Sequence, residues 1–269
     1  MVVYTASLII SLFLLCSPAL GGQQRQLCLK CHPSHYAGRG SCVACHRGNP
    51  NAERMNVAHY RMIAGRFAAF TLGDVPVVKE GNRLMDHYAC RRCHVSGRRG
   101  NRLATPLDTL IDEKTPEEIA EAIRVPAQGM PNFRFAEKSI VAVVNAIFAG
   151  GKNAGVTQGN RPLLVHFDAE PKGQENVFTR KCGTCHRALT EKLGLLGSGD
   201  IGPNLSGLLS SHYPKTFKAG EAWTEDRLKR WLENPRKVRP QAQMLPVQLK
   251  AGEFRELVDL LLVKHGDGK

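Results

Sequence analysis

The sequence predicts a fold made mainly of helices, on two observations. Apolar residues recur at helical spacing in several segments, and proline or glycine stands at the ends of those segments. Thr115–Val125 and Thr224–Asn234 each end directly before a proline, which disfavours continuation of a helix. Thr115 is expected to begin the first of these helices, because Glu118 can complete a capping box with it.

The same periodicity predicts further helices on both sides of these two. One is expected over Glu53–Phe70, and two closing helices are expected to end at Gly150-Gly151 and at Gly266. Gly81 and Gly173 each stand nine residues before a cysteine and are predicted to open a short helix. The apolar residues of the closing helices are Ile140, Val143, Val144, Ile147 and Phe148, and then Phe254, Leu257, Val258, Leu261 and His265.

The beginning of the chain predicts export. Met1–Leu20 contains no Lys, Arg, Asp or Glu, and its apolar run at residues 8–15 is too short to span a bilayer. We expect a signal peptide over residues 1–21, with lipid attachment at Cys16 as the alternative to its removal. The expected location is the periplasm, the outer membrane or the cell exterior, and no transmembrane helix is expected in the mature chain.

Eight of the nine cysteines occur in four copies of the spacing Cys-x-x-Cys-His. The copies are Cys28-Leu29-Lys30-Cys31-His32, Cys42-Val43-Ala44-Cys45-His46, Cys90-Arg91-Arg92-Cys93-His94 and Cys182-Gly183-Thr184-Cys185-His186. Two cysteines at this spacing can form thioethers with one haem, and the adjacent histidine can bind its iron. A zinc site would not require the adjacent histidine, and a thioredoxin-like redox site would use a single motif in a βαβ setting. We therefore expect four covalent haem c groups, with His32, His46, His94 and His186 as proximal ligands.

Three units are predicted from the distribution of these motifs. Residues 23–72 hold two motifs in a segment too short to build a core from side chains, so a di-haem module is expected there. Residues 80–151 and 172–266 repeat one order of features: an entry helix, a haem motif, a middle helix, a methionine near a proline, and a closing helix. We therefore expect residues 80–151 and 172–266 to be two copies of the same kind of domain.

The repeated order resembles class I cytochrome c domains. The resemblance implies an all-α fold, with an N-terminal di-haem module followed by two class I cytochrome c domains. It also implies His94 with Met130, and His186 with Met244, as axial ligand pairs of the iron. Each methionine could instead fill a gap in the core, and His212 is the alternative to Met244.

The family also implies that a proline carbonyl accepts a hydrogen bond from the proximal histidine, which fixes the imidazole. Pro203 matches that position well, and Pro106 matches it loosely.

Two histidines are candidates for the remaining distal ligands. His35 follows His32 by three positions and cannot easily bind the same iron, so we assign it to the second haem. We assign His59 to the first haem, and exchange of these two assignments is the alternative. Met55 and Met62 flank His59 at helical spacing and are fallback ligands or haem-packing side chains.

The arrangement of the whole chain carries a second resemblance. Its Cys-x-x-Cys-His-x-x-His-Tyr stretch, its Cys-x-x-Cys-His-Arg-Gly-Asn-Pro stretch and Ala58-His59-Tyr60-Arg61 resemble cytochromes of selenite/tellurite-reduction or extracellular-electron-conduit gene clusters of metal-reducing bacteria. This resemblance implies a role near the outer membrane in dissimilatory respiration, with other redox proteins or an outer-membrane conduit as partners.

Charge is distributed unevenly along the chain. Residues 23–102 contain 14 Lys and Arg against 4 Asp and Glu, which accounts for most of the formal net charge of +13. An exported protein does not meet nucleic acid, so acidic surfaces of redox partners are the expected targets. The alternative is that arginines such as Arg39, Arg47, Arg61 and Arg66 pair with haem propionates.

These observations predict an electron carrier rather than an enzyme, because every iron has a candidate second ligand. The alternative is a haem enzyme, di-haem peroxidase-like or an oxyanion reductase, with one open haem.

Overall fold

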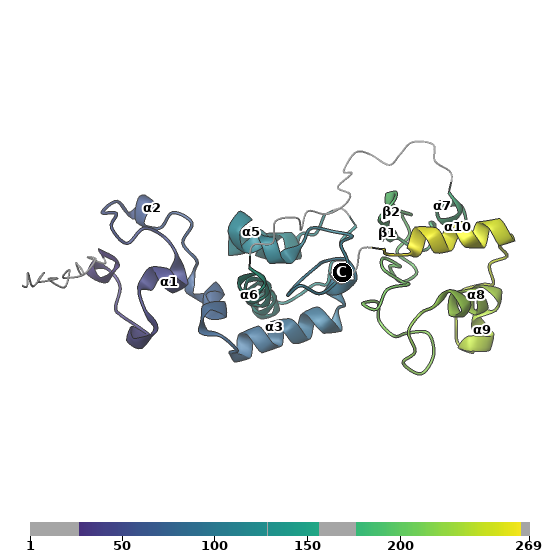
Figure 1. Cartoon of the computed structure of the whole chain (residues 1–269), viewed down its shortest axis with the longest axis horizontal. Helices are drawn as coiled ribbons and strands as arrows, with labels where there is room; N and C mark the ends of the chain where they lie inside the picture. Colours follow the sequence, from purple (N-terminus) through teal and green to yellow (C-terminus); the bar gives the residue numbers. More distant parts are fainter. Residues whose placement is uncertain (1–26, 128, 156–175, 265–269) are drawn as a thin grey trace, which may run out of the picture.

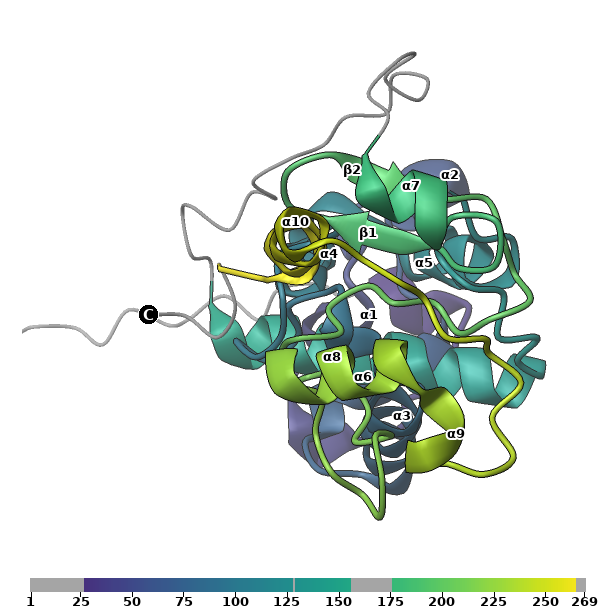
Figure 2. The same cartoon turned by 90° about the vertical axis from the view of Figure 1, so that its right-hand side faces the viewer.

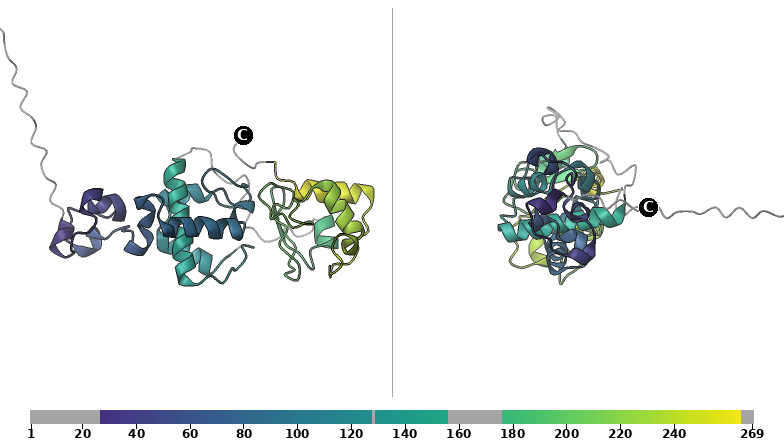
Figure 3. Two further views of the ribbon diagram at one scale, coloured as in Figure 1. Left: turned by 90° about the horizontal axis from the view of Figure 1, so that it is seen from below. Right: turned by 90° about the vertical axis from the view of Figure 1, so that its left-hand side faces the viewer.

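The computed structural model describes residues 27–127, 129–155 and 176–264. The predicted signal peptide and His265 lie outside these ranges. Three units follow one another along the long axis: a small N-terminal unit, a central helical unit and a C-terminal unit (Figure 1). The view from below shows the same row (Figure 3).

Short helical turns make up the N-terminal unit: η1 (Leu27–Lys30), η2 (Ala37–Arg39), α1 (Cys42–His46), α2 (Met55–Ala58), η3 (Gly65–Phe67) and η4 (Ala69–Leu72). The predicted helix over Glu53–Phe70 is wrong. Its first turn forms as α2, but Arg61 adopts a left-handed backbone conformation with φ of 54°. The chain then turns back so that the Ile63 amide donates to the His46 carbonyl at 2.6 Å, a partner that sequence periodicity cannot reveal.

The last residues of the N-terminal unit pack into the apolar core of the central unit. Ile63, Phe67 and Phe70 are buried in the same apolar cluster as the two long central helices. Asn145, fully buried on one of those helices, accepts from the Phe70 amide and donates to the Arg66 carbonyl, both at 2.9 Å. A buried side chain thus satisfies backbone groups where this segment enters the core.

The central unit contains α3 (Pro76–His87), η5 (Cys90–Arg92), η6 (Leu107–Thr109), α4 (Leu110–Glu113), α5 (Pro116–Arg124) and α6 (Glu137–Ala154). The capping box is confirmed: Thr115 Oγ1 accepts from the Glu118 amide, and the Glu118 carboxylate accepts from the Thr115 amide. The closing helix does not end at Gly150-Gly151, as predicted, but continues to Ala154. A Cβ on Gly151 would lie 2.6 Å from the Asp108 carbonyl oxygen, so the glycines permit close packing there instead of ending the helix.

Helices α3 and α6 form the main contact of the central unit, and Gly81 lies at their crossing. A Cβ on Gly81 would clash with the carbonyl oxygen of Ala142 and lie 2.7 Å from the Ala146 Cβ. The prediction that Gly81 opens a helix is therefore wrong, because α3 begins at Pro76 and Gly81 stands inside it. The matching prediction for Gly173 falls outside the described residues.

The C-terminal unit contains α7 (Val177–Lys181), β1 (Ala188–Thr190), β2 (Gly194–Leu196), α8 (Glu225–Glu233), α9 (Pro235–Val238) and α10 (Ala251–Leu261). Thr224 caps α8 by accepting from the Arg227 amide at 3.3 Å. Figure 2 shows β1, β2, α7 and α10 grouped on one side of this unit and α8 and α9 on the other.

The short β1–β2 hairpin corrects the all-α prediction. Its antiparallel register pairs Ala188 with Leu196 and Thr190 with Gly194. Ala188 and Leu196 are buried in the core of the C-terminal unit, and the hairpin contacts α10. Three-residue strands carry too little periodicity to be recognised from sequence.

None of the helices within the three described ranges is long and apolar enough to cross a membrane.

Gly81 and Gly252 form a matched pair for testing the helix crossing. The Gly81→Ala substitution is expected to destabilise the protein by about 3 kcal/mol, because the new methyl group meets the α6 backbone. Gly252→Ala places its methyl group in open space within α10 and should be neutral or stabilise by roughly 0.5 kcal/mol. Denaturant unfolding measures both; equal stability of the two variants would contradict the close crossing.

Candidate haem attachment sites

The cysteine motifs share one local backbone conformation. In the first, third and fourth motifs, the histidine amide donates to the carbonyl of the first cysteine, at 3.0, 3.0 and 2.9 Å. The second motif forms the five-residue helix α1. One helical turn thus brings each histidine, four positions on, next to the first cysteine of its motif. At this spacing, the two thiols and the imidazole of one motif can all bind the same prosthetic group.

Three of the four proximal histidines are held by a backbone carbonyl. The Nδ1 atoms of His46, His94 and His186 lie 2.9, 2.7 and 2.8 Å from the carbonyl oxygens of Ile63, Thr105 and Pro203, respectively. A carbonyl can only accept, so Nδ1 carries a proton, and in the neutral imidazole the lone pair is then on Nε2. The donor set therefore fits haem iron, which binds a neutral imidazole through Nε2.

The carbonyl partners were only partly predictable. Pro203 is the acceptor for His186, as the family resemblance implied. Pro106 is not the acceptor for His94: the preceding residue Thr105 takes that role, and the Pro106 carbonyl accepts from the Thr109 hydroxyl at 3.2 Å. Ile63 was missed entirely, because every residue has a backbone carbonyl and no residue type marks it as an acceptor.

In the N-terminal unit, each proximal histidine has a second histidine beside it. His35 Nε2 lies 3.4 Å from His46 Nε2, with the two rings nearly perpendicular. The ring centroids of His32 and His59 are 5.9 Å apart. Two imidazole–metal bonds of about 2 Å each would separate the two nitrogen atoms by about 4 Å. The Nε2–Nε2 distance between His35 and His46 would therefore need to increase only slightly to admit a metal ion.

Met130 and Met244 are both half-buried at the edge of a core. Met130 packs against the cluster formed by α3 and α6. Met244 packs in the C-terminal unit, where its Sδ accepts a hydrogen bond from Trp231 Nε1 at 3.1 Å. His212, the alternative ligand, is also half-buried in that unit.

Burial shifts the pKa of several groups in the third motif and of Cys182 in the fourth. It raises the pKa of the Cys90 and Cys182 thiols to about 11 each and also raises the pKa of Cys93. Burial lowers the pKa of His94, which favours the neutral imidazole. Because redox-active cysteines react as thiolates, the raised thiol pKa values disfavour a thiol-redox interpretation of these motifs.

Three of the arginines named as alternative partners of the propionates have protein partners. Arg47 Nη2 donates to the Ile111 carbonyl at 2.7 Å and Arg61 Nη2 to the Asp112 carbonyl at 3.0 Å. Arg66 lies 3.4 Å from the Glu137 carboxylate. The first two contacts join the N-terminal unit to α4 of the central unit.

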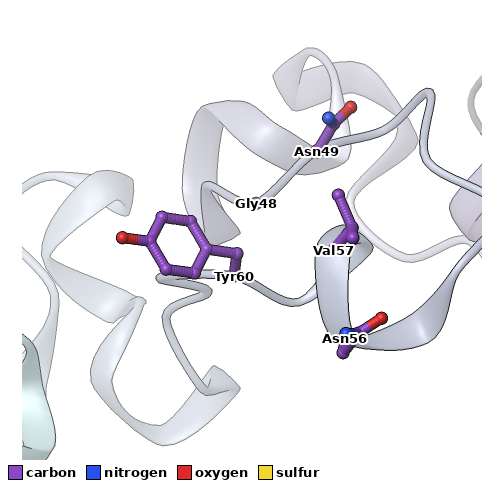
Figure 4. A pocket seen from close by; sticks show the side chains of 5 residues that line it. All are labelled: Gly48, Asn49, Asn56, Val57 and Tyr60. Carbon is purple, nitrogen blue, oxygen red and sulfur yellow. The ribbon is translucent and has the colours of Figure 1, made fainter.

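A cavity of about 330 Å³ lies beside α2 (Figure 4). Its lining consists of Gly48, Asn49, Asn56, Val57 and Tyr60. Its volume is at the lower end of the range for small-molecule sites. None of these five residues is a predicted ligand, so the cavity is distinct from the histidine pairs.

The helical core, the repeated Cys-x-x-Cys-His turn and the carbonyl-held imidazoles define a class of protein that binds haem c covalently. Residues 76–145 match the family model described as cytochrome c oxidase, cbb3-type, subunit III. A cytochrome c of Stellaria longipes is 35% identical over 100 residues, which cover 33% of this chain and 85% of the relative. No solved structure matches the chain significantly. The chain belongs to the cytochrome c family, whose members are typically electron carriers.

Gly202 and Gly65 allow the seating of two imidazoles to be compared. A Cβ on Gly202 would lie 2.5 Å from His186 Nδ1, whereas a Cβ on Gly65 would lie 3.9 Å from His46 Cε1. Gly202→Ala should therefore displace the His186 ring and change the absorption spectrum and midpoint potential of the fourth site, while Gly65→Ala leaves the second site unchanged. Spectroelectrochemistry measures both, and an unaltered fourth site in Gly202→Ala would contradict this geometry.

Proposed function

We propose that the chain carries four covalently bound haem c groups and transfers electrons between redox partners. The observation that carries the proposal is the set of Nδ1–carbonyl hydrogen bonds, since they select the tautomer with Nε2 available as a ligand at three Cys-x-x-Cys-His motifs. The first motif has the same backbone turn and a neighbouring histidine. Cys28 with Cys31, Cys42 with Cys45, Cys90 with Cys93, and Cys182 with Cys185 would form the thioethers.

The distal ligands proposed for the N-terminal pair are histidines. His35 would complete the second site, in keeping with its 3.4 Å approach to His46, and His59 would complete the first. Met130 and Met244 would complete the third and fourth sites. With a protein ligand on both sides of each iron, no coordination position remains for a substrate, which supports a carrier rather than a peroxidase or an oxyanion reductase.

When bound, haem c supplies an iron that cycles between its ferric and ferrous states. The chain's own contribution is to hold the imidazoles of His46, His94 and His186 through carbonyls and to surround the central and C-terminal sites with apolar side chains. The row of three units would place the four sites in sequence order along the molecule (Figure 1). Such an arrangement suits conduction from one end to the other.

We further propose that the protein acts after export, in the periplasm or at the outer membrane, in anaerobic respiration. The charge-free segment before residue 21 supports export. The basic balance of residues 23–102 supports partners with acidic surfaces, such as other redox proteins or an outer-membrane conduit.

The haem count can be read from the mass of the denatured chain, because thioether-linked haem survives unfolding. The mature protein is expected to carry four haem masses, and replacing both Cys182 and Cys185 by serine should remove one. Thr184→Ala, between the same two cysteines, should retain all four. A parent chain with fewer than four haems, or no loss in the double serine variant, would contradict the proposal.

The proposed ligand sets predict two groups of redox potentials. Methionine ligation raises the potential relative to bis-histidine ligation, so the third and fourth sites should reduce before the first and second. A potentiometric titration with spectroscopic resolution of the sites measures the order, and His59→Met should raise the potential of the first site alone. Reduction of the bis-histidine sites first would contradict the ligand assignment, and a high-spin iron in the oxidised protein would instead indicate an open haem.

A further inference from the structure

The third haem motif packs directly against the loop that follows the fourth. Arg92 lies between Cys90 and Cys93, and its Nη1 donates to the Asn204 carbonyl at 3.2 Å. The half-buried guanidinium thus reaches from the central unit to a residue of the C-terminal unit 112 positions later in the chain. A hydrogen bond from a charged donor shielded from solvent is stronger than one on an open surface.

The Asn204 carbonyl has a second donor in its own unit. The hydroxyl of Tyr213 donates to it at 3.1 Å, and the Arg92 guanidinium carbon lies 5.9 Å from the Tyr213 ring centroid. Tyr213 is buried, and burial raises its pKa, so the phenol keeps the proton that it donates. The carbonyl is therefore fixed from both sides of the junction.

Asn101 makes the second bridge between the units. The residue is 1% exposed, and its Nδ2 donates to the Arg92 carbonyl at 2.8 Å and to Ser210 Oγ at 2.7 Å. Gly207, with φ of 70°, lies so close that a Cβ there would come within 2.6 Å of the Arg92 carbonyl oxygen. The close approach of the two backbones and the buried Asn101 amide indicate a specific contact between the central and C-terminal units.

The junction connects the two attachment sites by a short path. Arg92 adjoins Cys93 in the third motif, and Asn204 adjoins Pro203, whose carbonyl accepts from His186 Nδ1 at 2.8 Å. One peptide unit therefore separates the carbonyl held by Arg92 from the carbonyl that holds the fourth proximal imidazole. The same contact that joins the units also bears on the position of His186.

We propose that Arg92 and Asn101 are positioning residues that dock the central unit onto the C-terminal unit and set the separation of the third and fourth haem attachment sites. This inference rests on the proposed function, because it concerns electron exchange between two sites that each carry a haem. The part played by these residues is to keep one docked arrangement populated, not to contact a redox partner.

Hydrogen exchange on the haem-loaded protein tests the docking. The turn amides of Leu208, Ser210 and Tyr213 lie in the loop that packs against Arg92 and Asn101, and α10 serves as the internal reference for the fold of the same unit. Arg92→Gln should reduce protection of this loop about tenfold while α10 stays protected. Arg92→Lys, which keeps a cationic donor, should recover part of the protection.

Two further variants separate docking from charge and from haem loading. Ser210→Ala removes the acceptor of Asn101 without altering a haem motif or the net charge, and it should also lower protection. Lys138→Gln removes one exposed positive charge from α6 and should leave protection unchanged. Intact mass gives the haem content of every variant before exchange is measured.

Electron redistribution after one-electron photoreduction supplies the functional readout. The fast exchange phase between the third and fourth sites should lose amplitude in Arg92→Gln and Ser210→Ala but not in Lys138→Gln. The inference is overturned if loop protection in both junction variants matches Lys138→Gln, or if protection falls while the fast phase is unchanged. Absence of haem at the third or fourth motif of the parent protein would instead refute the proposed function.

Discussion

The hydrogen bond from an imidazole Nδ1 to a backbone carbonyl is the contact on which the arrangement of the second, third and fourth motifs depends. Its acceptors lie 17, 11 and 17 residues after the histidines of the second, third and fourth motifs. Each bond closes a loop over its motif and selects the tautomer that can bind iron. The loops are themselves held elsewhere: Ile63 sits in the central core, and Pro203 adjoins the carbonyl held by Arg92.

The three units are connected by packing and by arginines that donate to backbone carbonyls. Residues 63–70 supply apolar side chains to the core of α3 and α6, so the N-terminal sites are anchored by a core that they do not contain. Arg47 of the N-terminal unit donates a hydrogen bond to the Ile111 carbonyl of the central unit. Arg92 of the central unit donates one to the Asn204 carbonyl of the C-terminal unit. A carbonyl does not neutralise a guanidinium, so these structural arginines still contribute to the basic potential of the chain.

Glycine has a different role in this fold from the one that its sequence positions suggest. Gly81 lies where α3 approaches the backbone of α6, and Gly151 lies where α6 approaches the backbone of Asp108. Neither glycine begins or ends its helix. Local sequence can mark a glycine as a possible helix end, but the need for contact without a side chain depends on a segment far away in the chain. The error over Glu53–Phe70 has the same origin, because a tertiary hydrogen bond between Ile63 and His46 competes with helix continuation.

The sequence by itself determined what depends on short range: the four Cys-x-x-Cys-His turns, the capped helices after Thr115 and Thr224, and the family. It also predicted that the closing helices would be amphipathic: α6 buries its predicted apolar residues, and α10 buries Leu257, Val258 and Leu261. Only the tertiary structure decided which carbonyls hold His46 and His94, where the small hairpin forms, and how Arg92 and Asn101 join two units; it also chose between the two histidine pairings that the sequence left open. The physical reason is that caps and motif spacing act over about one helical turn, whereas a backbone carbonyl is common to all residues and gains its role from its position in space.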